Sequence, residues 1–366
     1  MKNRLIYKLA PALFILVSIM FWLSQAQSKN DSFSEYRDFE KKPIVINKPD
    51  KINYYHNEEA LIREKLKLKL SQKEYSILAG LHWILGLADN DEAFQFLFPD
   101  FMLLMNTLSK SDTRIHQQEV IDKIIKASFA RVQKDFAKYF PKEEMARWRF
   151  LGLFPILLRH PEFQEKYFSF YTKNWADILS KDFASQEADY ETALKEKKFK
   201  TIFDYLVWPS LLHNYLVKVS KPPIITPADK FPEYVNRFKS FDYPDYSIDQ
   251  PGFRDLGYLA THVILALTAY GQEPMPEGEI KQKVQKYIES SFDKARILGD
   301  FDLFAEYIQS LKIINPKRDN KIKDLEQFLY DLQRPDGSWG SEKDFKTHPY
   351  TAIHPSGAAL MALNQP

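Results

Sequence analysis

Apolar residues recur at three- and four-residue spacing from Glu58 to the end of the chain, in long blocks separated by Pro, Asn, Asp and Gly. This spacing places apolar side chains on one face of an α-helix, and almost none of the chain shows the two-residue alternation of a half-buried strand. The pattern predicts an all-α protein made of sequential helical hairpins. The predicted helices are 58–70, 73–88, 91–108, 113–139, 142–159, 162–182, 186–197, 199–219, 230–240, 255–270, 277–297, 301–314, 319–333 and 351–363.

The N-terminal segment has the three-part pattern of a signal peptide. Lys2, Arg4 and Lys8 precede an apolar run from Leu9 to Leu23, and Ser24-Gln25-Ala26 supplies small residues for signal peptidase. The run of about 15 residues is shorter than the roughly 20 that span a bilayer. The pattern therefore predicts cleavage after residue 26 and a periplasmic or secreted protein. A count that begins at Leu5 keeps open an alternative, an inner-membrane anchor over residues 5–23.

The rest of the chain divides by composition. Residues 27–57 are polar and contain prolines, which predicts a linker or arm. Residues 58–366 are expected to form one helical domain. A proline-rich segment, 221–251, interrupts it and predicts a long loop between its halves, and loops longer than about 15 residues are commonly functional.

Composition narrows the chemistry. The 366 residues carry 51 Lys and Arg against 49 Asp and Glu, a net charge of +2 without a basic cluster, so nucleic acid is not an expected partner. A membrane is expected as a partner only if the N-terminal segment is retained. The chain has no cysteine, which excludes disulfides, thiolate zinc sites and cysteine nucleophiles, so a metal would need His, Asp or Glu ligands. The aromatic content of 15% predicts broad apolar packing surfaces or an aromatic-lined cavity.

The segment from Phe328 to Gly340 has the sequence Phe-Leu-Tyr-Asp-Leu-Gln-Arg-Pro-Asp-Gly-Ser-Trp-Gly. The amide of Gln333 can bond backbone groups of the next turn, Asp336-Gly337 can make a tight reversal, and the Trp339 ring can pack over the glutamine. This segment resembles the QW motif of the terpenoid cyclases and of the protein prenyltransferase β subunits. The resemblance, over roughly residues 255–363, implies an (α/α) toroid, which is a barrel of alternating inner and outer helices.

The chain departs from that superfamily at its active sites. Triterpene cyclases of this kind protonate their substrate with an Asp-x-Asp-Asp cluster, whereas residues 300–303 are Asp-Phe-Asp-Leu. Prenyltransferase β subunits hold zinc with an Asp-x-Cys pair and a later His, and toroidal lanthipeptide cyclases use Cys, Cys and His. Without a thiolate, and with a signal peptide, the chain is not expected to share these activities.

Two predicted helices carry polar faces on otherwise apolar surfaces. In helix 255–270, Asp255, Tyr258 and His262 fall within about 60° of one another, and a polar stripe on a buried helix predicts a cavity or a satisfied core histidine. The other helix begins at Asp300, which has the character of an N-cap.

Beyond that cap, Asp302, Glu306 and Gln309 share a face opposite Phe304, Leu311 and Ile314. Capping and interaction with the helix dipole account for Asp300, and for Asp302 in part, without any function. They do not extend to Glu306 in the second turn.

Two histidines, His348 and His354, follow the QW-like segment and precede the last helix. In the prenyltransferase β subunits the zinc His lies just after the corresponding turn. The resemblance therefore implies that His348 or His354 is a metal ligand, and that Asp300 or Asp302 takes the place of the Asp-x-Cys pair. The alternative is that both histidines are surface residues beside prolines.

Together these residues predict a zinc-like divalent metal site in the cavity of the toroid. The expected ligands are His262, Asp300, Asp302, His348 and His354, and the candidate catalytic groups are Glu306 and Tyr258. Such a site would support metal-assisted hydrolysis or elimination. One alternative is a non-catalytic protein that binds a small-molecule, lipid or saccharide ligand or has a structural role. Another is a toroidal polysaccharide lyase, although the chain shows no clear set of Asn, His, Tyr and Arg for it.

Overall fold

The computed structural model describes residues 71–88, 91–109, 115–140, 150–219, 227–250, 252–316, 320–340 and 349–365. This part of the chain is helical and contains no strand, which confirms the all-α prediction. None of its helices is long and apolar enough to span a bilayer. The predicted signal peptide (1–26), the arm (27–57) and the helix 58–70 lie outside the described residues. The helices are α4 (Gln72–Ala88), α5 (Asp91–Leu108), α6 (Ile115–Val132), α7 (Phe136–Tyr139), α9 (Phe154–Leu157), α10 (Pro161–Asn174), α11 (Ala176–Glu196), α12 (Phe199–Val219), α13 (Pro227–Phe238), α14 (Gly252–Leu267), α15 (Glu279–Leu298), α16 (Phe301–Ile314), α17 (Asn320–Leu332) and α19 (Pro349–Asn364).

Some predicted boundaries were wrong. The single helix predicted over 113–139 is divided into α6 and α7, because Asp135 caps α7 by accepting a 3.1 Å hydrogen bond from the backbone N–H of Lys138. Of the predicted helix 142–159, residues 142–149 lie outside the described residues, and within 150–159 the structure has the short helix α9. The proline-rich segment contains α13, which confirms the predicted helix 230–240 and means that the segment is not one long loop. This helix begins at Pro227, because the first turn of a helix does not need the N–H that proline lacks.

A break was also predicted at the wrong place between residues 162 and 197. The chain interrupts its helix at Trp175 and then continues without a break through α11. The Trp175 ring is buried edge-on against the rings of Phe140, Phe150 and Phe170, with centroid distances of 5.8, 4.8 and 5.0 Å. Burial of this ring fixes the position of the break, and no sequence signal for a helix end marks it.

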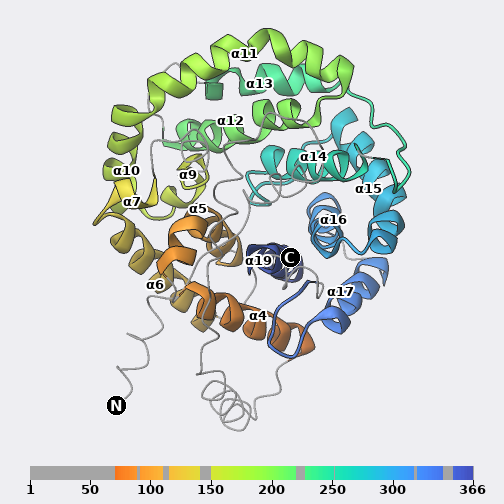
Figure 1. Cartoon of the computed structure of the whole chain (residues 1–366), viewed down its shortest axis with the longest axis horizontal. Helices are drawn as coiled ribbons and strands as arrows, with labels where there is room; N and C mark the ends of the chain where they lie inside the picture. Colours follow the sequence, from red (N-terminus) through yellow and green to blue (C-terminus); the bar gives the residue numbers. More distant parts are fainter. Residues whose placement is uncertain are drawn as a thin grey trace.

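The described helices lie in two concentric sets (Figure 1). The outer set is α4, α6, α10, α11, α15 and α17, and the inner set is α5, α9, α12, α14, α16 and α19. Each inner helix contacts the next inner helix in sequence, and the last one, α19, contacts the first one, α5. The contacts between inner helices therefore form a closed circuit. The α13 helix packs against α11 and α12.

The segment after α17 joins two helices of the outer set, α17 and α4. The side-chain amide of Gln333 donates hydrogen bonds of 2.9 Å to the Ser76 carbonyl oxygen in α4 and 3.0 Å to the Gly337 carbonyl oxygen. Gly337 has a φ of +91°, and a Cβ at this position would lie 2.3 Å from the Ala79 carbonyl oxygen. Only glycine therefore fits this turn against α4.

Three neighbouring inner helices run in the same direction. Asp302, in the first turn of α16, contacts His354 in the second turn of α19, while Lys312 in the last turn of α16 donates a 2.7 Å hydrogen bond to the Ala362 carbonyl oxygen near the end of α19. Tyr258, in the second turn of α14, donates to Asp302. The N-terminal ends of α14, α16 and α19 therefore meet at one end of the ring.

Candidate metal centre

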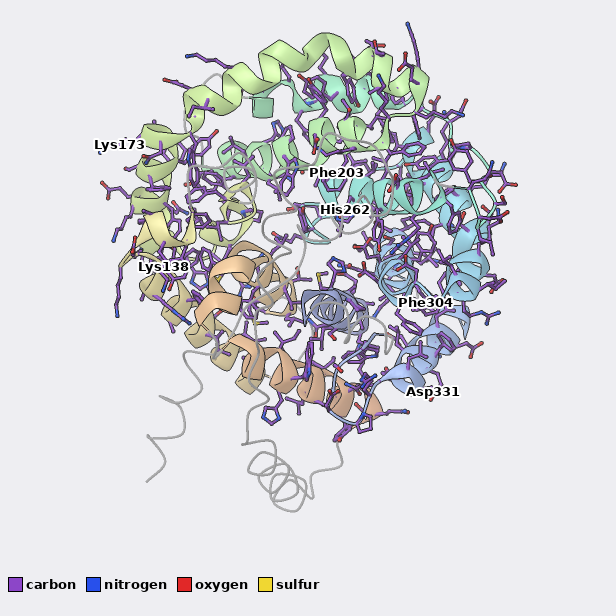
Figure 2. The ribbon with its side chains drawn as sticks, in the orientation of Figure 1. Lys138, Lys173, Phe203, His262, Phe304 and Asp331 are labelled. Atoms are coloured by element: carbon purple, nitrogen blue, oxygen red, sulfur yellow. The ribbon has the colours of Figure 1, made fainter. Side chains whose placement is uncertain are left out.

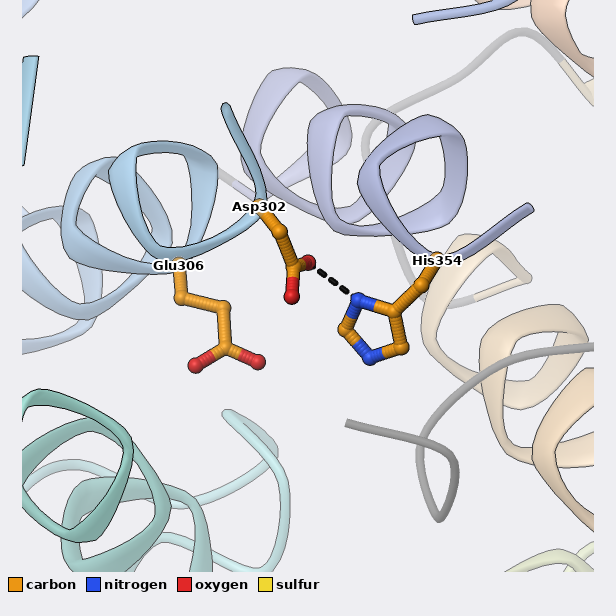
Figure 3. Close-up of side chains that lie close together, drawn as sticks. All are labelled: Asp302, Glu306 and His354. Atoms are coloured by element: carbon orange, nitrogen blue, oxygen red, sulfur yellow. Dashed lines mark hydrogen bonds and ion pairs between the residues drawn. The ribbon is translucent and has the colours of Figure 1, made fainter. Parts of the chain in front are cut away.

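Asp302, Glu306 and His354 come together where α16 and α19 begin (Figure 3). Each offers one potential ligand atom, and these atoms lie within 4.8 Å of one another. Asp302 and Glu306 are one helical turn apart on α16, so both side chains leave the same face. Glu306 and His354 are each 2% exposed. The two carboxylates and the imidazole form a buried cluster with the donor types that a divalent cation prefers.

The polar face of α16 is the one predicted. The opposite face of the helix is apolar, and its Phe304 ring packs against Phe292 and Phe328 with centroid distances of 4.6 and 5.0 Å. These two partners belong to the outer helices α15 and α17. Phe304 therefore faces the outer layer, and the carboxylates face the inner helices.

Hydrogen bonds hold the two oxygens of Asp302. The Tyr258 hydroxyl donates a 2.7 Å hydrogen bond to Oδ2, and Nδ1 of His354 contacts Oδ1. The other nitrogen of His354, Nε2, is buried and has no hydrogen-bond partner among the described residues. A buried imidazole nitrogen without a partner is unusual, because such atoms normally find a donor or an acceptor.

Glu306 is held from α14. Thr261 donates a 2.5 Å hydrogen bond from its hydroxyl to Oε2 of Glu306, and Nδ1 of His262 lies 3.7 Å from the same oxygen. Burial raises the pKa of Glu306 well above its ordinary value, and the neighbouring Asp302 carboxylate raises it further. Without a cation, Glu306 is therefore favoured in its protonated form.

His262 lies beside the cluster and is not one of its three members. Its Nδ1 is 2.9 Å from the Tyr258 carbonyl oxygen, and its ring lies 4.9 Å from the Phe203 ring on α12 (Figure 2). Because the carbonyl can only accept, Nδ1 carries the hydrogen and Nε2 carries the lone pair. This Nε2 is also buried without a partner among the described residues.

Of the two aspartates that the sequence left open, Asp302 joins the cluster. Asp300 is the N-cap of α16, as predicted, and accepts a 3.2 Å hydrogen bond from the Leu303 backbone N–H. Its other oxygen lies 2.6 Å from Nε of Arg254. Burial raises the pKa of Asp300, and the Arg254 guanidinium opposes this shift. These contacts give Asp300 a structural role next to the site, and the expectation that it is a ligand is not supported.

Of the two histidines predicted after the QW-like segment, the structure describes His354. His354 is in the cluster, and His348 lies outside the described residues. His354 lies within α19, which begins at Pro349. This agrees with the predicted helix 351–363 and corrects the placement of His354 before the last helix. Pro349 starts the helix because its fixed φ suits the first turn.

Sequence reasoning missed Arg254 and Thr261. Arg254 is one helical turn before Tyr258 on α14, a spacing that places both side chains on one face, and Thr261 directly precedes His262. The predicted stripe used Asp255 in place of Arg254. The available signal was the helical spacing from Tyr258. Arg254 lies four residues before Tyr258 and Asp255 lies three residues before it, and both spacings place the side chain on the same face of the helix.

The contribution of His262 to the stability of the metal-free protein is expected to fall as the pH falls from about 6.5 to about 4. Burial lowers the pKa of His262 to about 4 from 6.5, with the bond to the Tyr258 carbonyl partly opposing it. As the pH falls below 6.5 the unfolded chain takes up a proton that the folded protein refuses, so the free energy of unfolding decreases until about pH 4. At 1.36 kcal/mol for each pH unit the loss is about 3 kcal/mol.

Urea unfolding at pH 7 and pH 4.5, in the presence of a chelator, measures this loss. The His262→Gln variant can still donate to the Tyr258 carbonyl but does not titrate in this range, so its decrease in stability should be smaller than that of the wild type by about 2–3 kcal/mol. An equal decrease in both proteins would contradict the assignment.

Comparison with protein-family models, curated proteins and solved structures finds no match. The functional assignment therefore depends on the geometry of the site.

Proposed function

We propose that the protein is an exported (α/α)-toroid enzyme that binds one divalent cation at the cluster formed by Asp302, Glu306 and His354 and catalyses hydrolysis or elimination. The observation that carries this proposal is the convergence of three potential ligands within 4.8 Å, of which Glu306 and His354 are buried and Asp302 is half-buried. Buried carboxylates without a cation are unfavourable, because two negative charges repel each other in a medium of low polarity. A bound cation would neutralise both.

The toroid assignment is supported by the closed circuit of inner helices and the outer helices around it. It is also supported by the turn after α17, where Gln333 bonds the backbone of α4 and Trp339 is buried. These contacts link one outer helix to its neighbour, which is the structural role that the QW motif has in the superfamily it resembles. Stacking of the Trp339 ring on Gln333 remains a prediction.

The donor set suits a cation such as Zn²⁺, Mn²⁺ or Fe²⁺, which accept imidazole nitrogen and carboxylate oxygen. When bound with an open coordination position, such a cation polarises a carbonyl or generates hydroxide at neutral pH. The residues of this chain would then orient the substrate and move protons. Because a ligating carboxylate is deprotonated, Glu306 would give up its proton when the cation binds, and Tyr258 positions Asp302.

Export is proposed from the N-terminal pattern alone. A periplasmic or secreted location would also suit a fold that has no cysteine to oxidise. The substrate would be a small molecule, a lipid or a saccharide.

Elemental analysis of the purified protein tests the metal site. The protein is recovered from a periplasmic extract, and its intact mass reports whether the chain begins after Ala26. We expect about one equivalent of zinc or a similar metal per chain, and less than about a tenth of this in Glu306→Gln and His354→Gln, because each variant removes a ligand from the site.

His160→Gln is the matched control. His160 is also buried, with Nδ1 3.7 Å from Oε1 of Glu162, but it belongs to no group of three potential ligands in the described part of the chain. This variant should retain the wild-type metal content. A wild-type protein that contains no metal and takes up none on dialysis would contradict the metal site and favour the non-catalytic ligand-binding alternative.

A further inference from the structure

Both oxygens of Asp302 are engaged by hydrogen-bond donors. Oδ2 accepts the 2.7 Å hydrogen bond from the Tyr258 hydroxyl, and Oδ1 is in contact with Nδ1 of His354. A cation bound to either oxygen would have to share it with one of these donors. The arrangement is the one expected of a carboxylate that orients a histidine, since ligating histidines commonly donate their second ring N–H to a carboxylate.

The contact with Asp302 also decides which nitrogen of His354 is available. A carboxylate only accepts, so the hydrogen of the neutral ring lies on Nδ1 and the lone pair lies on Nε2. Nε2 is buried, has no hydrogen-bond partner among the described residues, and points into the space that the Glu306 carboxylate also faces (Figure 3). This atom has the electron pair and the position of a metal ligand.

Glu306, like His354, has one polar atom held by neighbours and one that is not. Thr261 donates to Oε2, and the contact with His262 is to the same oxygen, which leaves Oε1 without a hydrogen bond from the described residues. The unengaged oxygen and the unengaged nitrogen belong to side chains whose ligand atoms can approach within 4.8 Å. A first-row cation bound to both would bring the two ligand atoms to about 3–4 Å from each other.

We propose that the cation is bound by Nε2 of His354 and Oε1 of Glu306, and that Asp302 and Tyr258 are positioning residues outside the coordination shell. This inference rests on the proposed function. It assigns only two ligands to the described residues, so at least two coordination positions of a zinc-like ion remain for water, substrate or a further side chain. A site of this kind would bind its metal less tightly than a closed structural zinc site.

Long-range ¹H–¹⁵N correlation spectra of the histidine rings test the assignment in the wild-type protein. On titration with Zn²⁺, the Nε2 resonance of His354 should shift while Nδ1 keeps its proton, and comparison with the His354→Gln spectrum identifies the ring. A shift of Nδ1 in place of Nε2 would overturn the proposal. Because the titration uses the wild-type protein, its result does not depend on whether a variant of Asp302 folds.

Calorimetric titration with Zn²⁺ alone provides the second test. We expect Asp302→Asn and Tyr258→Phe to keep one site with an affinity about 10–100-fold lower, because outer partners of ligands typically contribute this much. The double variant should be no more than about threefold weaker than Asp302→Asn, since Tyr258 acts through Asp302. Asp331→Asn, a carboxylate that accepts a hydrogen bond from Gln327 on α17, is the control and should bind like the wild type.

Absorption of the Co²⁺-loaded proteins separates positioning from ligation. The visible bands of Asp302→Asn should keep the wild-type positions if Asp302 is outside the shell. Complete loss of binding in folded Asp302→Asn, or a changed band pattern, would overturn the inference and leave the proposed metal site intact. Absence of Zn²⁺ binding by the wild type would instead overturn the proposed function, and the inference with it.

Discussion

Replacement of Trp339 by alanine is expected to lower the free energy of unfolding by about 3–5 kcal/mol, the usual loss when a large aromatic side chain is removed from a core. Trp339 is 1% exposed, and its indole N–H donates a 2.8 Å hydrogen bond to the Leu329 carbonyl oxygen. Its backbone N–H donates a 2.9 Å hydrogen bond to the Ser356 hydroxyl. The residue thus joins α17 to α19, and truncation leaves both a cavity and an unpaired carbonyl.

Denaturant unfolding of Trp339→Ala and Trp339→Phe measures this effect. The phenylalanine variant keeps most of the apolar ring and should lose clearly less stability than the alanine variant. Metal content of the folded fraction should not change, because the ring is not part of the cluster. A loss below about 1 kcal/mol in Trp339→Ala would contradict the packing described here.

A substitution at Gly80 in α4 tests the position of the Trp339 ring from the other side. A Cβ on Gly80 would lie 2.6 Å from Cζ3 of Trp339 and 2.9 Å from Cδ2 of Leu360. In an exposed helix, replacement of glycine by alanine stabilises by up to about 1 kcal/mol. Gly80→Ala should instead destabilise, because the indole ring is rigid and has no room to move. The sign of this change is a second check on the position of the ring.

Replacement of Lys312 by methionine is expected to lower the free energy of unfolding by about 3–5 kcal/mol, because it leaves a buried carboxylate without its partner. The Lys312 side chain is fully buried, and its ammonium group donates hydrogen bonds of 2.7 Å to Oε1 of Glu326 and to the Ala362 carbonyl oxygen. Lys73 lies 4.0 Å from Glu326 and is too distant to replace the lost charge in full.

A double-mutant cycle identifies the cause. Lys312→Met combined with Glu326→Leu removes both charges, and replacement of a buried pair by apolar residues is often close to neutral. We therefore expect the double variant to be more stable than Lys312→Met alone, by chemical denaturation. If the two losses simply added, the ion pair would not be the source of the effect.

The all-α class was predictable from sequence because the apolar spacing of an amphipathic helix is a local property. The face of α16 that carries Glu306 and the cap at Asp300 follow from such spacing, and both predictions agree with the structure. The break at Trp175 was not predictable in this way. It depends on rings contributed by Phe140 after α7, Phe170 in α10 and Phe150 before α9, which no local pattern reports.

The site was predictable in part for the same reason. Glu306 and Asp302 are neighbours on one helix, so their spacing brought them together, and His354 came from the resemblance to the prenyltransferase β subunits. The choice of Asp302 over Asp300 depends on Arg254, which pairs with Asp300 across two helices. The engagement of Asp302 by Tyr258 likewise depends on the distance between α14 and α16, which the sequence does not report.

Closure of the ring has a consequence for the order of folding. The bond from Gln333 to Ser76 spans 257 residues, and α19 packs on both α4 and α5. Contacts of such long separation form late, because the entropy of closing the intervening chain is lost before the contact stabilises anything. A nascent chain therefore keeps α4 and α5 without their contacts to α19 until that helix has been synthesised, and the cluster of Asp302, Glu306 and His354 assembles in the same step that joins the two ends of the helical circuit.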